Sequence, residues 1–152
     1  MAHPGVFAPL RASSRTTRLH IEPAEAGAGA APGSGTGTPG ASPEVPVAAN
    51  ALRRLRGFLL SGERALLIVP CSSVHGIGMT RDFETAYLDR DGTVLRTALL
   101  RPWRAHGLLR GSVAALEAEP GSFECWGIST GARVVPTASP RTDDAPQVED
   151  AA

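Results

Sequence analysis

The chain has 152 residues, of which 17 are glycine and 13 proline. Together these make up about a fifth of the chain, where roughly 12% is usual. All 15 basic residues are arginine, and 15 acidic residues bring the formal net charge to zero. The glycines keep no three-residue period, which excludes collagen, and no apolar run reaches the roughly 18 residues of a membrane span. So many chain breakers predict that only part of the sequence packs into a domain.

The first 21 residues predict an arm outside the folded domain. They hold three arginines and no acid, and the short apolar run at 6–10 is interrupted by Pro9. A secretory signal places its charge before a longer apolar stretch, so we expect no export signal and a cytoplasmic location. Residues 16–21 have the pattern of a single strand, but we favour a disordered arm over 1–21.

Two further segments are predicted to be disordered. Residues 22–44 form a linker rich in Gly, Pro and Ala, which buries too little apolar surface to offset the entropy lost on ordering. Residues 138–152 carry four acids and one arginine, the composition of an acidic tail. The domain at 45–137 has a modest basic excess without a phosphate-binding stripe, so we expect no nucleic-acid partner.

Residues 45–137 suffice for one small core. Residues 50–60 predict a short helix after the N-cap Asn50, because their leucines have helical spacing. The apolar run at 63–69 is typical of a central strand, and residues 71–79 predict an irregular loop.

The second half of the domain is predicted from turn signals and alternation. Strands at 83–88 and 93–100 form a hairpin around the Asp-Arg-Asp-Gly turn between them. Residues 112–119 alternate, which predicts a strand with Glu117 facing outward. A short helix near 122–127 and a last strand at 133–135 follow, so the fold class is mainly β. We expect a small barrel or sandwich with two short helices, flanked by disordered segments.

Four segments occur in an order that we recognise. They are RLRGFL at 54–59, PCSSVHGIGM at 70–79, YLDRDGTVL at 87–95 and LRPWR at 100–104. The set resembles the family called domain of unknown function 192 (DUF192), over about residues 46–136. The resemblance implies a compact β-rich domain and no established activity.

The chain departs from the pattern of this family at two places. Where the family usually has Pro-Ile-Asp before a strand, this chain has Asp82, Phe83 and Glu84, so the acid is one methylene longer. Gly76 stands where Thr is common, which removes a hydroxyl beside His75.

Cysteine and histidine residues suggest chemistry that their spacing does not support. Cys71 and His75 are the residue types of a thiolate–imidazolium nucleophile, but Cys–His catalysts bring the two from distant segments. We therefore interpret Cys71 as a packed core residue. A zinc site made from these two with His106 and Cys125 lacks paired spacings, and a disulfide needs an oxidising compartment, so neither is expected. Without lysine or a third glycine at 76–78, no nucleotide cofactor is expected.

The binding candidates lie on loops. Glu84 shares a strand face with Ala86 and Leu88, and His75 or Arg104 is its expected partner. Trp103 beside Arg104 is a common recognition pair, and the alternative is a tryptophan that plugs the barrel end.

These residues lead to two hypotheses. The first is a non-enzymatic accessory module, for example in envelope or secretion-related assembly, that binds a small ligand or a protein segment. Its candidate binding residues are His75, Met79, Glu84, Trp103 and Arg104. The second is a small enzyme that uses Cys71, His75 and Glu84.

Overall fold

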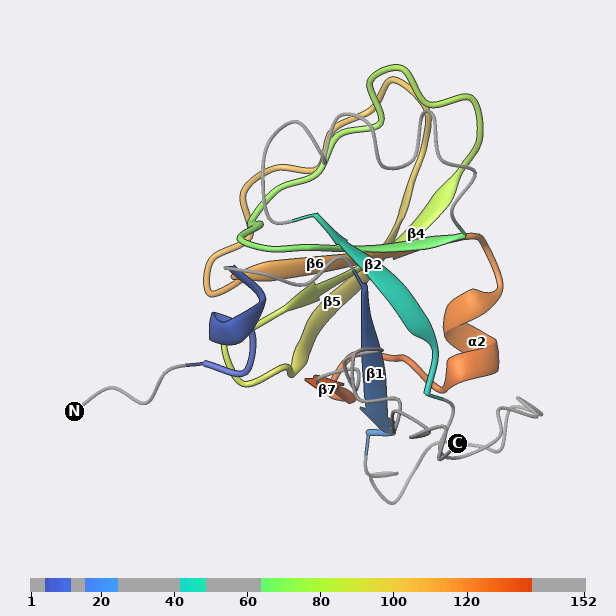
Figure 1. Cartoon of the computed structure of the whole chain (residues 1–152). Coiled ribbons are helices and arrows are strands. Elements are labelled where there is room, and N and C mark those ends of the chain that lie inside the picture. The colour runs from blue at the N-terminus through green and yellow to red at the C-terminus, as the bar shows by residue number, and fades with distance from the viewer. Residues whose placement is uncertain (1–4, 12–15, 25–41, 49–63, 138–152) are drawn as a thin grey trace, which may run out of the picture.

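The structure is a computed structural model that describes residues 5–11, 16–24, 42–48 and 64–137. Within these ranges, seven strands form one curled sheet in the order β5-β4-β6-β3-β2-β1-β7 (Figure 1). The mainly β fold class is thereby confirmed. The elements are η1 (Ala8–Arg11), β1 (Thr16–Glu22), β2 (Glu44–Ala48), β3 (Ala65–Ile68), β4 (Phe83–Leu88), β5 (Val94–Leu100), β6 (Ala114–Ala118), α2 (Ser122–Trp126) and β7 (Arg133–Thr137).

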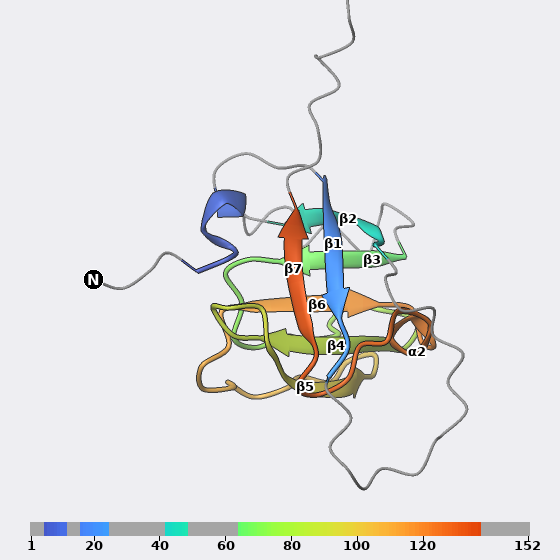
Figure 2. The ribbon, with the colours of Figure 1, turned by 90° about the horizontal axis from the view of Figure 1, so that it is seen from below.

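The sheet curls so far that its two end strands meet. β1 and β7 cross the other strands steeply in Figure 2. The N–H of Val94, at the start of β5, donates to the Ala132 carbonyl at 2.8 Å, and the N–H of Gly131 donates back to Val94 at 2.9 Å. An isolated bridge between Thr93 and Arg133 continues this contact. The half-barrel is thus closed at one end.

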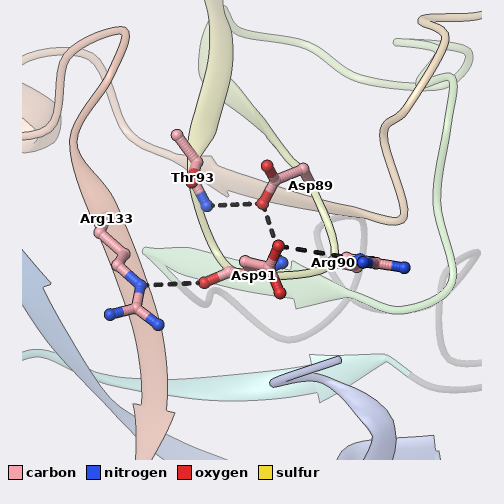
Figure 3. A network of polar contacts seen from close by, with 5 residues as sticks. All are labelled: Asp89, Arg90, Asp91, Thr93 and Arg133. Atoms are coloured by element: carbon pink, nitrogen blue, oxygen red, sulfur yellow. Dashed lines mark hydrogen bonds and ion pairs between the residues drawn. The ribbon is translucent and has the colours of Figure 1, made fainter. Parts of the chain in front are cut away.

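The hairpin of β4 and β5 forms around the predicted turn (Figure 3). Asp89 Oδ1 accepts hydrogen bonds from the N–H groups of Asp91 at 2.9 Å and Thr93 at 2.8 Å. Gly92 has a φ of 88°, a left-handed conformation that glycine adopts without strain. Arg133 Nε donates to the Asp91 carbonyl at 3.1 Å, which attaches β7 to this turn.

The N-terminal residues differ from the expected disordered arm over 1–21. Residues 16–22 form β1, which pairs with both β2 and β7, and its alternate side chains Leu19 and Ile21 are buried. Phe7 and Leu10 are buried in the same core. The alternation was visible in the sequence, but the partner strand β7 lies more than 100 residues away. The folded unit therefore begins before residue 45.

The remaining predicted elements lie partly inside and partly outside the described residues. The short helix near 122–127 and the last strand are confirmed as α2 and β7. The helix predicted at 50–60, the central part of the linker and the tail at 138–152 lie outside the described residues. No helix in the described ranges is long and apolar enough to cross a membrane.

Both faces of the central strands are buried. The first core, enclosed by the curl, takes side chains from all seven strands and from α2. The second core lies on the opposite face of β3, β4 and β6 and includes Leu66, Phe83, Tyr87 and Ala115. Glu117 lies on this second face and is only 5% exposed, so the prediction that it faces outward is wrong. The alternation of residues in the sequence correctly separated the two faces of this strand. It could not show that the face of Glu117 is covered as well.

Candidate functional site

Two loops pair through their backbones next to the second core, at the top of Figure 1. We call residues 71–79 and 101–111 the paired loops. The N–H of Gly76 donates to the Arg104 carbonyl at 2.7 Å, and the N–H of Trp103 donates to the Gly76 carbonyl at 2.8 Å. Further bonds join His106 to Val74 and Leu109 to Ser72, both at 2.9 Å. The two loops therefore form one ordered surface.

Gly76 permits this close approach. A Cβ atom at this position would lie 2.5 Å from the carbonyl oxygen of Arg101, a distance that real Cβ contacts do not reach. In this chain, any side chain at position 76 would push the paired loops apart. The departure from the threonine common in the family is thus a requirement of the local backbone.

Trp103 lies on the surface of the paired loops. Its side chain is 71% exposed, so of the two alternatives for this residue the structure favours exposure over plugging the barrel. Its φ of 60° is the single positive value among non-glycine residues in the described ranges. A left-handed conformation costs a non-glycine residue about 1–2 kcal/mol. Backbone strain of this kind is concentrated at functional sites.

Other large apolar side chains are exposed on the paired loops. Ile77, next to the Gly76 that bonds Trp103, is 57% exposed, and Leu108 is 74% exposed. Three of the four exposed large hydrophobic residues in the described ranges thus lie on the paired loops, the fourth being Leu99 on β5. The exposure of Ile77 and Leu108 was not predictable from the sequence, because it depends on how the two loops pair.

The charged residues of the paired loops have one sign. The paired loops contain no Asp or Glu, and they contain three arginines. All three are exposed, namely Arg101, Arg104 and Arg110. Summing charge over the whole domain hid this asymmetry, because the acids of the β4–β5 turn, β6 and α2 offset it.

The remaining predicted site residues are not all brought together. His75 is exposed and forms a backbone bridge with Ala105, while Met79 is 7% exposed in the second core beneath the loops. Glu84 lies on the opposite face of β4. Its Oε2 accepts a hydrogen bond from the N–H of Phe123 in α2 at 2.9 Å. The partner of Glu84 is therefore a helix backbone and not His75 or Arg104.

The residues of the enzyme hypothesis are separated in the same way. Cys71 is buried, and its Sγ donates to the carbonyl of Ser73 at 3.1 Å. Cys71 packs in the second core, whereas Glu84 lies on the other side of the sheet against α2. Cys71 and Cys125 are not joined by a disulfide bond. In the part of the chain that the structure describes, no three His, Cys, Asp or Glu side chains gather as metal ligands would.

A tyrosine–histidine contact links the second core to the paired loops. The hydroxyl of Tyr87 lies 3.0 Å from Nδ1 of His106. Burial raises the pKa of Tyr87 to about 12, and the nearby Cys71 and Glu117 add to this increase. His106 stood out in the sequence only as a candidate zinc ligand, and no local signal pointed to its contact with Tyr87.

The chain is similar to proteins that have been grouped but not characterised. Residues 35–136 match the family model DUF192, described as "Uncharacterized ACR". A UPF0127 protein of Pyrococcus abyssi is 31% identical over 70 residues, which cover 41% of this chain. The match spans 60% of that relative, less than two thirds of its length.

Two solved structures share the fold. One, from Sinorhizobium meliloti, is described as a "putative transcription regulator" and has a TM-score of 0.58 at 15% identity, covering 82% of this chain and 95% of that one. The other, a protein of unknown function from Novosphingobium aromaticivorans, has a TM-score of 0.53 at 14% identity, covering 77% and 82%. At these identities the likeness concerns the fold alone.

Proposed function

This chain belongs to the DUF192 family, and we propose that it is a non-enzymatic module whose paired loops bind a segment of a protein partner. The partner segment presents apolar side chains flanked by carboxylates. The observation that carries this proposal is the exposed Trp103, which is held in a strained conformation by its backbone bond to Gly76.

The apolar part of the surface supports a protein partner over a small ligand. Ile77, Trp103 and Leu108 are each more than half exposed. Side chains that project in this way suit a contact between two surfaces, whereas a small ligand is usually enclosed in a concave pocket. Tryptophan and arginine are also the residue types that dominate binding energy at protein interfaces.

The charged part of the surface supports a partner segment that carries negative charge. The paired loops hold three exposed arginines and no carboxylate. Complementary charge raises association rates and rejects partners of the wrong sign. An acidic segment with an aromatic or aliphatic anchor fits both features.

A displayed library of random 12-residue peptides, selected on the immobilised full chain, tests the proposal directly. We expect the enriched peptides to combine acidic residues with an aromatic or large aliphatic residue. The affinity of a synthetic enriched peptide should fall by at least about tenfold in W103G and in R104E. Glycine at position 103 keeps the positive φ without strain, so W103G removes the side chain and preserves the loop.

Matched controls come from residues of the same types outside the paired loops. L99A removes the exposed leucine of β5, and R90A removes an exposed arginine in the β4–β5 turn. Both should bind the peptide as the unmodified chain does. Enrichment of basic peptides, no enrichment, or equal binding by W103G would each contradict the proposal. The cytoplasmic location and the envelope- or secretion-related role remain predictions.

A further inference from the structure

Two polar side chains lie side by side in the second core. Glu117 on β6 and Thr85 on β4 are directly opposite each other in the antiparallel register. Residues paired in this way point to the same face, with Cβ atoms about 4.5–5.5 Å apart. Glu117 is 5% exposed and Thr85 is fully buried. A carboxyl and a hydroxyl therefore share one small region beneath the surface.

Neither group has a partner among the described residues. Thr85 Oγ1 is the one fully buried side-chain oxygen or nitrogen in these ranges without a hydrogen bond. No hydrogen bond or ion pair reaches the Glu117 carboxyl there either, and the ion pairs of β6 and its flank involve Glu119 instead. Buried polar groups are almost always hydrogen-bonded, so the unpaired Thr85 hydroxyl beside the nearly buried Glu117 carboxyl calls for an explanation.

The surroundings make the carboxyl costly to ionise. Leu66 on β3 is the other cross-strand neighbour of Glu117, and Phe83 lies next to Thr85 on the same face of β4. Burial raises the pKa of Glu117 to about 7. A leucine at position 117 would avoid this cost, so the carboxylate suits a cation that arrives from outside.

We propose that Glu117 and Thr85 form a binding site for the primary ammonium group of a small amine, whose apolar stem lies against Leu66 and Phe83. An ammonium group has three donors, of which the Glu117 carboxylate and Thr85 Oγ1 accept two. It is also a compact ion, which suits a site with one carboxylate and one hydroxyl better than a planar guanidinium does. The chain contains no lysine, so no side chain of its own supplies this group.

The Thr85 side of the pair lies one strand away from the β5 edge of the sheet. Thr85 is paired on its other side with Ala98 of β5, the first strand in the sheet order. Ala98 is only half-buried and is the smallest side chain on this face of β5, where Arg96 and Leu100 flank it. On this side, one small and partly exposed residue therefore lies beside Thr85. This site does not depend on partner binding at the paired loops.

Titration of the full chain with n-butylamine, with butan-1-ol as the neutral control of equal size, tests the site. The readouts are the melting temperature at pH 8 and the carboxyl ¹³C signal of Glu117 followed by NMR. We expect butylammonium to raise the melting temperature and to move the Glu117 titration to lower pH by about one unit or more, as a nearby opposite charge does. Butan-1-ol should do neither.

Variants of the two residues distinguish binding of the ammonium group at this site from nonspecific binding of the amine elsewhere on the protein. E117Q has nearly the same shape and removes the charge, so its melting temperature should no longer respond to the amine. T85S keeps the hydroxyl and should respond as the unmodified chain does, while T85V should respond more weakly.

Four results would overturn the proposal. They are an equal response to butan-1-ol, an unchanged response in E117Q, no response at 100-fold excess over millimolar protein, and a Glu117 pKa near 4.5 without amine. The last would mean that the carboxylate already has a cationic partner. If a water molecule bridges Glu117 and Thr85 and the amine has no effect, the outcome is the absence of a response, and the proposal is overturned.

Discussion

Replacement of Glu117 by glutamine should stabilise the protein, and the gain should depend on pH. The pKa of Glu117 is raised from 4.5 to about 7 by burial in the folded state. The folded protein therefore holds this proton more tightly than the unfolded chain does. This contribution to stability is fully present below pH 4.5 and is lost as the pH rises through 7.

The size of the effect follows from the same two values. One pKa unit corresponds to about 1.4 kcal/mol, so the span from 4.5 to about 7 corresponds to roughly 3 kcal/mol. At pH 8 the unmodified chain has lost this contribution to stability, whereas E117Q has no carboxyl group at this position to ionise. The free energy of unfolding of E117Q should thus exceed that of the unmodified chain by up to about 3 kcal/mol at pH 8. At pH 4 the two should differ little.

Urea denaturation of both proteins at pH 4 and pH 8 measures this difference, because the free energy of unfolding extrapolates linearly to water. Taking the difference between the two proteins at each pH cancels the titration of all other groups. E119Q is the matched control, two residues further along the chain. Glu119 is paired with Arg81 at 3.0 Å on a partly exposed surface, so E119Q should cost less than about 1 kcal/mol.

The reasoning would be refuted if E117Q were less stable than the unmodified chain at pH 8. It would also be refuted if the difference between the two proteins were the same at both pH values. Either result would mean that Glu117 is ionised and compensated in the folded state. An effect of E119Q as large as that of E117Q would show that the measurement reports surface charge.

Three further changes test the surrounding structure. G76A should destabilise the fold by about 1–3 kcal/mol and weaken peptide binding, because its Cβ meets the Arg101 carbonyl; an unchanged melting temperature would contradict this. E84A should lower stability by about 1 kcal/mol and speed amide exchange at Phe123, whereas E84Q, which keeps an acceptor, should do so less. Iodoacetamide should label the exposed cysteine of the native protein before Cys71, as read by peptide mass spectrometry, and equal labelling rates would argue against the burial of Cys71.

The sequence predicted those parts of the fold that depend on neighbouring residues. The β4–β5 hairpin was predictable because Asp89 and Gly92 determine the turn locally, and α2 because glycines flank it. β1 was missed although its alternation was noted. Its stability comes from pairing with β7, and no local pattern shows which distant strand will be the partner.

The exposed loop residues of the candidate site were predictable, because the composition of the loop identifies them. Trp103 and Arg104 stood out as an aromatic and a cation in a loop with glycine and proline, and both are exposed. The partner of Glu84 was mispredicted because the packing of α2 against β4 brings the Phe123 N–H to it. Glu117 was assigned to solvent because a period of two residues identifies a face but does not show what covers it.

The closure of the half-barrel has a consequence for the solution behaviour of shortened chains. An unpaired strand edge is a template on which a second chain can add, and proteins protect such edges. β1 pairs with β2 on one side and β7 on the other, so its removal would bare an edge on each of those strands at once. Leu19 and Ile21 would also leave the first core. A fragment that starts at residue 45, as composition alone would suggest, should therefore self-associate. In the full chain, β1 protects the edges of β2 and β7 from pairing with a second molecule.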